Sequence, residues 1–139
     1  MIYVLDTDHV SLDQRGDRYV RARVAEAGPA AVAISVITIK EQLRGWLAAT
    51  RAATTAIARA RAYARLRLTL EYFASTTILD FTEQADARVA TLRQQGIRIG
   101  TQDLRIAACA LEHDATVVTR NRADFGQIPG LLMVDWSLP

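Results

Sequence analysis

The sequence contains very few of the residues that form disulfides or bind zinc. Cys109 is the only cysteine among the 139 residues, and His9 and His113 are the only histidines. A single cysteine cannot form an internal disulfide, and this small set cannot supply a cysteine-rich or histidine-rich zinc site. We therefore expect neither feature, and we interpret Cys109 as a small residue of the hydrophobic core.

Long hydrophobic runs are also missing. No apolar stretch approaches the roughly 18 residues of a membrane span, and the chain passes from Met1 to Asp6 without the basic and apolar regions of a signal peptide. We therefore expect a cytoplasmic protein that does not associate with membranes. Because 50% of the residues are hydrophobic, a chain of this length can bury one core, and we expect a single domain over residues 1–139.

Acidic residues are absent from the stretch between Glu41 and Glu71. Six of the 17 basic residues lie there, all of them arginine, which leaves 11 basic against 15 acidic residues in the rest of the chain. The positive charge is therefore local. Because arginine makes bidentate contacts to phosphate, we expect a polyanionic partner; the alternative is an ordinary solvated helix face. The candidate RNA-binding residues are Arg44, Arg51, Arg59 and Arg65.

The pattern of apolar residues predicts an α/β fold. Short apolar, partly β-branched runs predict strands at 2–5, 31–34, 76–79, 116–119 and 131–134. Stretches of helical composition or short turns separate them, at 7–14, 17–27, 35–49, 52–73, 82–95, 101–112 and 121–125. This alternation predicts a mostly parallel central sheet of about five strands flanked by helices. The two helices within residues 36–75 should form a protruding arm.

Two acidic residues are placed where open α/β sheets hold ligands, at the carboxyl ends of strands. Asp6 directly follows the first predicted strand, and its alternative role is to cap the next turn. Asp103 falls in the first turn of a nearly all-apolar helix, for which Thr101 is the expected N-cap. An aspartate there gains roughly 0.3–1 kcal/mol from the helix dipole without any function. Small residues on the same face, Ala107 and Ala110, would let this helix end approach the sheet edge.

Two further acids follow the second and the fourth predicted strands. Glu41 fits a capping box with Thr38, so its alternative role is to close a helix start. Asp124 comes five residues after the fourth strand, and its alternative role is that of an ordinary turn acid. Four carboxylates converging at one sheet edge would repel one another and become protonated unless a divalent cation held them.

The residue types of this acidic set indicate which cation and which reaction to expect. Oxygen ligands without histidine or cysteine suit Mg²⁺ or Mn²⁺ rather than zinc. Such an ion can activate water and stabilise an in-line displacement at phosphorus. The sequence therefore predicts phosphodiester hydrolysis at the sheet edge, with a basic arm nearby that holds the rest of a nucleic acid.

Four stretches resemble the successive motifs of PIN domains, and most closely those of the VapC-type toxins of bacterial toxin–antitoxin pairs. In chain order they are Ile2–Thr7, Ser35–Glu41, Ile99–Ala108 and Val118–Phe125. The segment from Ile128 to Trp136 is similar to the last strand of the family, so the resemblance spans essentially the whole chain. Each motif is weak alone, whereas four in order at these spacings are specific.

The resemblance implies a PIN fold and a metal-dependent ribonuclease that uses Mg²⁺ or Mn²⁺. It assigns the catalytic and metal-binding quartet to Asp6, Glu41, Asp103 and Asp124, of which Asp6 and Asp103 match the positions most closely tied to the metal. Asn121 is a neighbouring alternative to Asp124 at the fourth position. The resemblance also implies a homodimer and inhibition by a cognate VapB-like antitoxin.

Two other interpretations remain open at this point. Leu5–Asp8 superficially resembles the nucleophile strand of haloacid-dehalogenase-type phosphatases, in which the first aspartate attacks phosphorus. Those enzymes need a later lysine, and the sole lysine, Lys40, is poorly placed at a helix start. The second interpretation is a PIN-like module that binds RNA or protein without catalysis. His9 stands where many members of the family have a small or apolar residue, and the sequence offers no explanation for it.

Overall fold

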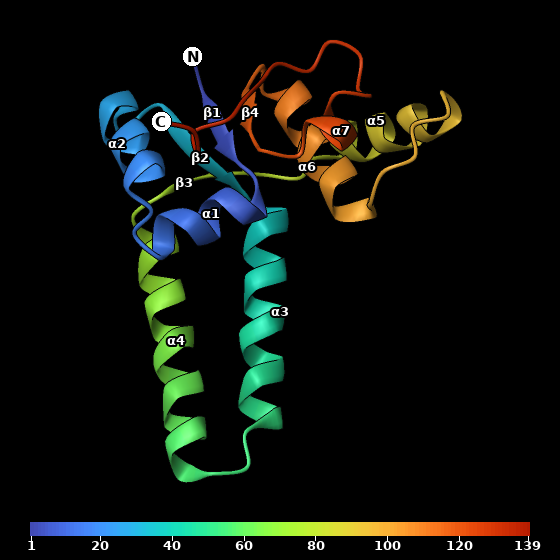
Figure 1. Cartoon of the computed structure of the whole chain (residues 1–139). Helices are drawn as coiled ribbons and strands as arrows, with labels where there is room; N and C mark the ends of the chain where they lie inside the picture. Colours follow the sequence, from blue (N-terminus) through green and yellow to red (C-terminus); the bar gives the residue numbers. More distant parts are fainter.

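The computed structural model describes all residues from 1 to 139 and is built on a sheet of five strands, in the order β3-β2-β1-β4-β5 (Figure 1). Every neighbouring pair is parallel, so the predicted parallel sheet is confirmed. The strands are β1 (Tyr3–Leu5), β2 (Val32–Ser35), β3 (Thr77–Leu79), β4 (Thr116–Val118) and β5 (Met133–Val134). Parallel strands need crossover connections, which the helices supply.

Seven helices connect and cover the strands. They are α1 (Thr7–Gln14), α2 (Arg18–Ala27), α3 (Val36–Ala52), α4 (Ala56–Ala74), α5 (Glu83–Gln94), α6 (Thr101–Glu112) and α7 (Arg122–Phe125). All lie within a few residues of the predicted positions. Helix α6 begins at Thr101, but its N-cap is Gly100 and no side chain caps it, so the prediction that Thr101 caps this helix is wrong.

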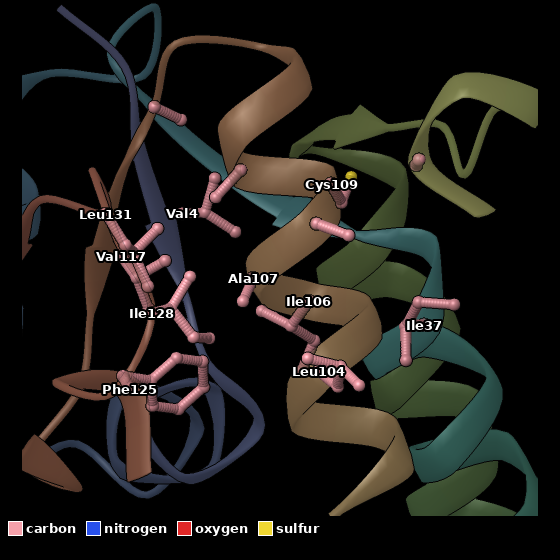
Figure 2. Packing of buried hydrophobic residues seen from close by; sticks show 14 of the residues in the cluster. Val4, Ile37, Leu104, Ile106, Ala107, Cys109, Val117, Phe125, Ile128 and Leu131 are labelled. Atoms are coloured by element: carbon pink, nitrogen blue, oxygen red, sulfur yellow. The ribbon is translucent and has the colours of Figure 1, made fainter. Parts of the chain in front are cut away.

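The larger core lies between α5, α6 and one face of the sheet. Val4 and Val117 project from adjacent strands onto the same face, because alternate residues of a strand point to opposite sides. Opposite them, α6 is buried over most of its surface, including Ile106 and Cys109 (Figure 2). The prediction that α6 is a buried helix and that Cys109 belongs to the core is confirmed. This packing fixes the position of the first turn of α6 relative to the sheet edge.

A smaller core covers the opposite face of the sheet. Leu5 and Val118, the strand residues next to Val4 and Val117, point into it and meet Phe73 from the end of α4. Trp136, after β5, is also buried here, and its ring lies 4.9 Å from that of Tyr3 on β1. The C-terminal segment is thereby attached to the central strand.

Helices α3 and α4 form an antiparallel hairpin that projects from the body of the molecule, as predicted for the arm (Figure 1). Helix α1 lies across the base of this hairpin. The predicted helix start at residue 52 is wrong, because α3 ends at Ala52, residues 53–55 are not helical and α4 begins at Ala56. No glycine or proline marks this break; Thr55 caps α4 by accepting a hydrogen bond from the Ala58 N–H at 3.1 Å. None of the helices combines the length and apolarity that a membrane crossing requires.

Candidate active site at the acidic sheet edge

Asp6 occupies the carboxyl end of the central strand, where β1 lies between β2 and β4. It is buried, and it is also the N-cap of α1, since its Oδ1 accepts a hydrogen bond from the His9 N–H at 2.8 Å. The helix-capping role considered for Asp6 is therefore real. It occupies one carboxylate oxygen, and Oδ2 has no hydrogen-bond partner within the protein.

Glu41 reaches the same edge from α3, the helix that directly follows β2. The cap of α3 is Ser35, whose hydroxyl accepts a hydrogen bond from the Ile37 N–H at 3.1 Å. The suggested capping box of Thr38 and Glu41 is therefore wrong, because the helix has already begun at Val36. The Thr7 hydroxyl, one residue after Asp6, donates instead to Glu41 Oε1 at 2.8 Å. Glu41 is thus tied to the end of β1 rather than to its own helix start.

Asp103, in the first turn of α6, carries the clearest electrostatic evidence that the acids converge. Burial, together with the charges of Asp6, Glu41 and Asp124, raises the pKa of its carboxyl to about 6. Charges act on a pKa in this way only over short distances. The structure therefore brings all four predicted acids together around Asp103.

Asp124 lies in α7 and is held by Asn121, the N-cap of that short helix. The Asn121 side-chain amide donates to Asp124 Oδ2 at 3.0 Å, and Asn121 Oδ1 accepts from the Asp124 N–H at 3.3 Å. Asp124 and Asn121, treated as alternatives in the sequence, are therefore partners in the structure. Asn121 faces the crevice, and Asp124 stands behind it.

These residues surround a polar crevice of about 540 Å³ with no hydrophobic lining. Of the acidic quartet, Asp6 and Asp103 line the crevice. Glu41 and Asp124 do not line it, but their charges help to raise the pKa of Asp103. The other lining residues are Thr7, Asp8, Arg120 and Asn121.

The model of the PIN domain family matches residues 3–131, which is nearly the whole chain. The chain belongs to the PIN domain family. Among curated proteins, Ribonuclease VapC2 of Rickettsia felis is 29% identical over 144 residues, covering 99% of each chain.

Solved structures show the same relationship between this PIN domain and the VapBC proteins. The toxin chain matched in the DNA-bound VapBC of Salmonella typhimurium has a TM-score of 0.76 and 26% identity, with 98% of both chains covered. VapBC-1 of nontypeable Haemophilus influenzae matches with a TM-score of 0.74 and 28% identity, over 99% of this chain and 100% of that one. The sequence-based identification of the family and of the fold is confirmed.

Arg120 and Asp8 at the rim of the PIN crevice were not predicted. The Arg120 guanidinium donates to both oxygens of Asp8, at 2.6 and 3.0 Å. This bidentate pair neutralises Asp8 and leaves the quartet as the unpaired charge of the crevice. The sequence did contain a clue to Arg120, which comes two residues after the end of β4. Ligand-binding residues of open α/β sheets follow the carboxyl ends of strands, and the same rule had located Asp6.

The donor set of the crevice fits a hard divalent cation. Oxygens dominate it, and the mutual repulsion seen at Asp103 is the cost that a cation would relieve. The tightest set of ligand-type atoms, within 4.8 Å of one another, belongs to Asp6, Asp8 and His9. The quartet is spaced more widely, which suits Mg²⁺, an ion that keeps several waters and takes few carboxylates directly.

The candidate RNA-binding arginines do not gather on one surface. Arg44 and Arg51 line an apolar groove of about 610 Å³ along α3. Arg65, on α4, lines a separate polar hollow of about 490 Å³ beside Trp46, between the hairpin and α1. Arg59 is exposed on α4. None of the four forms an ion pair, so their charges are available to a partner.

Replacing Asp103 by asparagine should change how the stability of the metal-free protein depends on pH. Because its folded-state pKa of about 6 exceeds the ordinary 3.8, the folded wild type binds more protons than the unfolded chain between these values. Stability contributed by Asp103 is therefore lost as the pH rises through this window. In urea titrations with excess chelator, the wild type should lose stability relative to Asp103→Asn from pH 4 to pH 7.

The exposed acid Asp86 on α5 supplies the control. The difference between wild type and Asp86→Asn should not show the same fall with pH. An Asp103→Asn variant that is less stable than the wild type at pH 7 would contradict a repulsive cluster.

Proposed function

We propose that this PIN domain is a metal-dependent endoribonuclease and the toxin of a toxin–antitoxin pair in the cytoplasm. The observation that carries the proposal is the position of Asp103, where burial and the charges of Asp6, Glu41 and Asp124 together raise the pKa of its carboxyl. The likeness to Ribonuclease VapC2 over 99% of the chain supports RNA as the substrate. The likeness to toxin chains of VapBC complexes supports the toxin role.

The quartet Asp6, Glu41, Asp103 and Asp124 would hold Mg²⁺ or Mn²⁺. When bound, such a cation supplies an activated water and stabilises the charge that develops on the phosphate during hydrolysis. Asp6, whose Oδ2 has no hydrogen-bond partner, and Asp103 both line the crevice. These two residues have the most direct access to the ion.

The remaining residues orient the acids and the water. The Thr7 hydroxyl fixes one oxygen of Glu41, and the Asn121 amide fixes one oxygen of Asp124. Each of these two carboxylates keeps a second oxygen that has no hydrogen-bond partner within the protein. A carboxylate held in one orientation loses little freedom during the reaction, which is the advantage of a preorganised site.

Two variants test the nuclease assignment. We expect the purified chain to cleave RNA with Mg²⁺ or Mn²⁺ and to lose cleavage in excess chelator. Asp6→Asn and Asp103→Asn should each abolish cleavage in gel assays while the far-UV circular dichroism spectrum stays unchanged, because each removes one charge of the site. Asp86→Asn, a change at an exposed residue of α5, should cleave like the wild type.

The same experiment separates the two alternative functions. Full RNA cleavage in excess chelator would contradict the metal-site assignment. A phosphorylated Asp6 would favour the phosphatase. The structure gives that alternative little support, because Lys40 lines the groove on α3 and not the acidic crevice. If the chain binds RNA but does not cleave it with any divalent metal, the result would favour the non-catalytic binding module.

We propose that the arginine-rich arm holds the RNA backbone. Arg67 pairs with Glu71 on α4, whereas Arg44, Arg51, Arg59 and Arg65 form no ion pair. The hollow that contains Arg65 also presents Trp46, an aromatic surface on which a base can stack. Helix α1 links this hollow to the crevice, since Thr7 contacts Glu41 at one end of α1 and Gln14 lines the hollow at the other.

Replacing Arg59 and Arg65 by glutamine should weaken RNA binding similarly for all sequences. In the inactive Asp103→Asn background, the slope of log affinity against log salt should become shallower by about one per lost phosphate contact. Fluorescence anisotropy with labelled RNA at several salt concentrations measures this slope. Arg18→Gln is the control, because Arg18 lies on α2, outside the arm, and stacks on Tyr19. An unchanged slope in the arm variant would mean that these arginines form an ordinary solvated helix face and do not contact phosphate.

We also propose a VapB-like antitoxin and a second copy of this chain as protein partners of the arm. Large apolar side chains stay exposed on it, among them Leu47, Ile57 and Tyr63. The groove along α3 is apolar with a basic border, which suits the apolar face of an acidic amphipathic helix. An arginine from such a partner could neutralise the quartet and block cleavage directly.

Co-expression with the short reading frame next to this gene tests the toxin assignment. The neighbouring product should co-purify, restore growth and suppress cleavage. Leu47→Asp places a charge in the groove and should reduce co-purification while RNA cleavage by the free chain stays intact. If no neighbouring product binds and the chain is harmless when induced, the toxin role is lost and the nuclease proposal stands alone.

A further inference from the structure

We propose that His9, braced by Asp135, is a positioning residue that fixes the orientation of Asp6 and thereby raises the affinity of the crevice for its divalent cation. The inference rests on the proposed function of that site. It explains a residue for which neither the sequence pattern nor the quartet provides a role.

His9 holds one side of the Asp6 carboxylate. The ring is completely buried in the first turn of α1, and its Nδ1 lies 3.2 Å from Asp6 Oδ1. A carboxylate oxygen only accepts, so this nitrogen carries the proton. The backbone N–H of His9 donates to the same oxygen at 2.8 Å. Two donors on Oδ1 prevent the carboxylate from rotating and leave Oδ2 directed to the crevice.

Asp135 lies against the other side of the His9 ring. His9 Nε2 is buried, has no hydrogen-bond partner and lies 3.5 Å from Asp135 Oδ1. That oxygen accepts from the Ser137 N–H at 2.8 Å and from the Ser137 hydroxyl at 2.6 Å. Burial works against ionisation of Asp135, but Ser137 and the charges of His9 and Arg122 lower its pKa overall. A fixed, ionised carboxylate therefore faces the histidine.

The segment that carries Asp135 is rigidly attached to the strand that carries Asp6. Trp136 is buried and packs against Tyr3 of β1 with ring centres 4.9 Å apart. Asp6 follows β1, and Asp135 lies next to Trp136, which packs on β1. The chain of contacts from Asp6 through His9 to Asp135 is therefore connected to β1 at both ends. Such a chain can resist the repulsion between Asp6 and the other acids of the crevice.

His9 is placed to orient a ligand and not to be one. Although Asp6, Asp8 and His9 offer ligand atoms within 4.8 Å of one another, both ring nitrogens face carboxylates and the ring is sealed from solvent. Asp8 is itself engaged by both hydrogen bonds from Arg120. Outer partners that orient metal-binding side chains typically change metal affinity by roughly 10–100-fold when removed.

Matched substitutions at His9 separate positioning from space filling. The amide nitrogen of asparagine can take the place of Nδ1, whereas that of glutamine can take the place of Nε2. If His9 positions Asp6, His9→Asn should keep Mn²⁺ affinity within a few-fold of wild type, and His9→Gln and His9→Ala should each weaken it by roughly 10–100-fold. If His9 only fills space, the larger glutamine should be the better replacement.

The experiment measures Mn²⁺ affinity of the full chain, without RNA, by isothermal titration and by the electron paramagnetic resonance signal of free Mn²⁺. Asp135→Asn should weaken binding in the same direction although Asp135 does not line the crevice. His113→Asn is the control, since its Nδ1 lies 2.8 Å from the Cys109 carbonyl oxygen, away from the acids. Urea unfolding identifies variants that do not fold. Only the variants that fold are then used to judge whether His9 positions Asp6.

The outcomes distinguish this inference from the proposed function. Wild-type affinity in His9→Gln and in Asp135→Asn overturns the positioning role and leaves the metal site intact. Weak binding in His9→Asn together with normal binding in His9→Gln overturns it as well. If the wild-type chain itself binds no Mn²⁺, the metal site and the positioning role both fall.

Discussion

Repulsion between carboxylates at the carboxyl edge of the parallel sheet is the constraint on which the rest of this structure depends. The topology alone creates it, because β1, β2 and β4 end side by side and pass directly into segments that carry Asp6, Glu41 and Asp124. The buried helix α6 then brings Asp103 to the same edge and holds it there against the repulsion. Hydrophobic packing in the core thus opposes an electrostatic cost at the site.

Three of the four acids of the cluster are each held by a neighbouring group that is not a carboxylate. Thr7 holds Glu41, Asn121 holds Asp124, and His9 holds Asp6. These contacts act on one oxygen of each carboxylate and leave the other oxygen for the crevice. The excess positive charge lies apart from this cluster, on the α3–α4 hairpin, where Arg67 and Glu71 form the one ion pair and several apolar side chains remain exposed.

Most of the architecture follows from local sequence signals. Short β-branched runs produced the five strands, and the all-round apolarity of residues 101–112 identified the buried helix. Parallel topology and the edge rule then predicted where Asp6 would lie. The errors were local as well: Gly100 rather than Thr101 caps α6, and a threonine cap without glycine or proline divides the arm. Several residues in a row can serve as a cap, and only packing selects one.

The sequence by itself determined the class of fold and placed four acids close after strands or in the first turn of α6, because these features depend on periodicity and on residue type. Tertiary structure decided which side chains touch. The contact of Thr7 with Glu41 joins residues 34 positions apart, and the contacts of Arg120 with Asp8 and of Asp135 with His9 span nearly the whole chain. No local pattern encodes such pairs, since they arise only when separate strands end at the same edge. The buried position of His9 between two carboxylates is therefore a property of the folded sheet and not of the sequence around it.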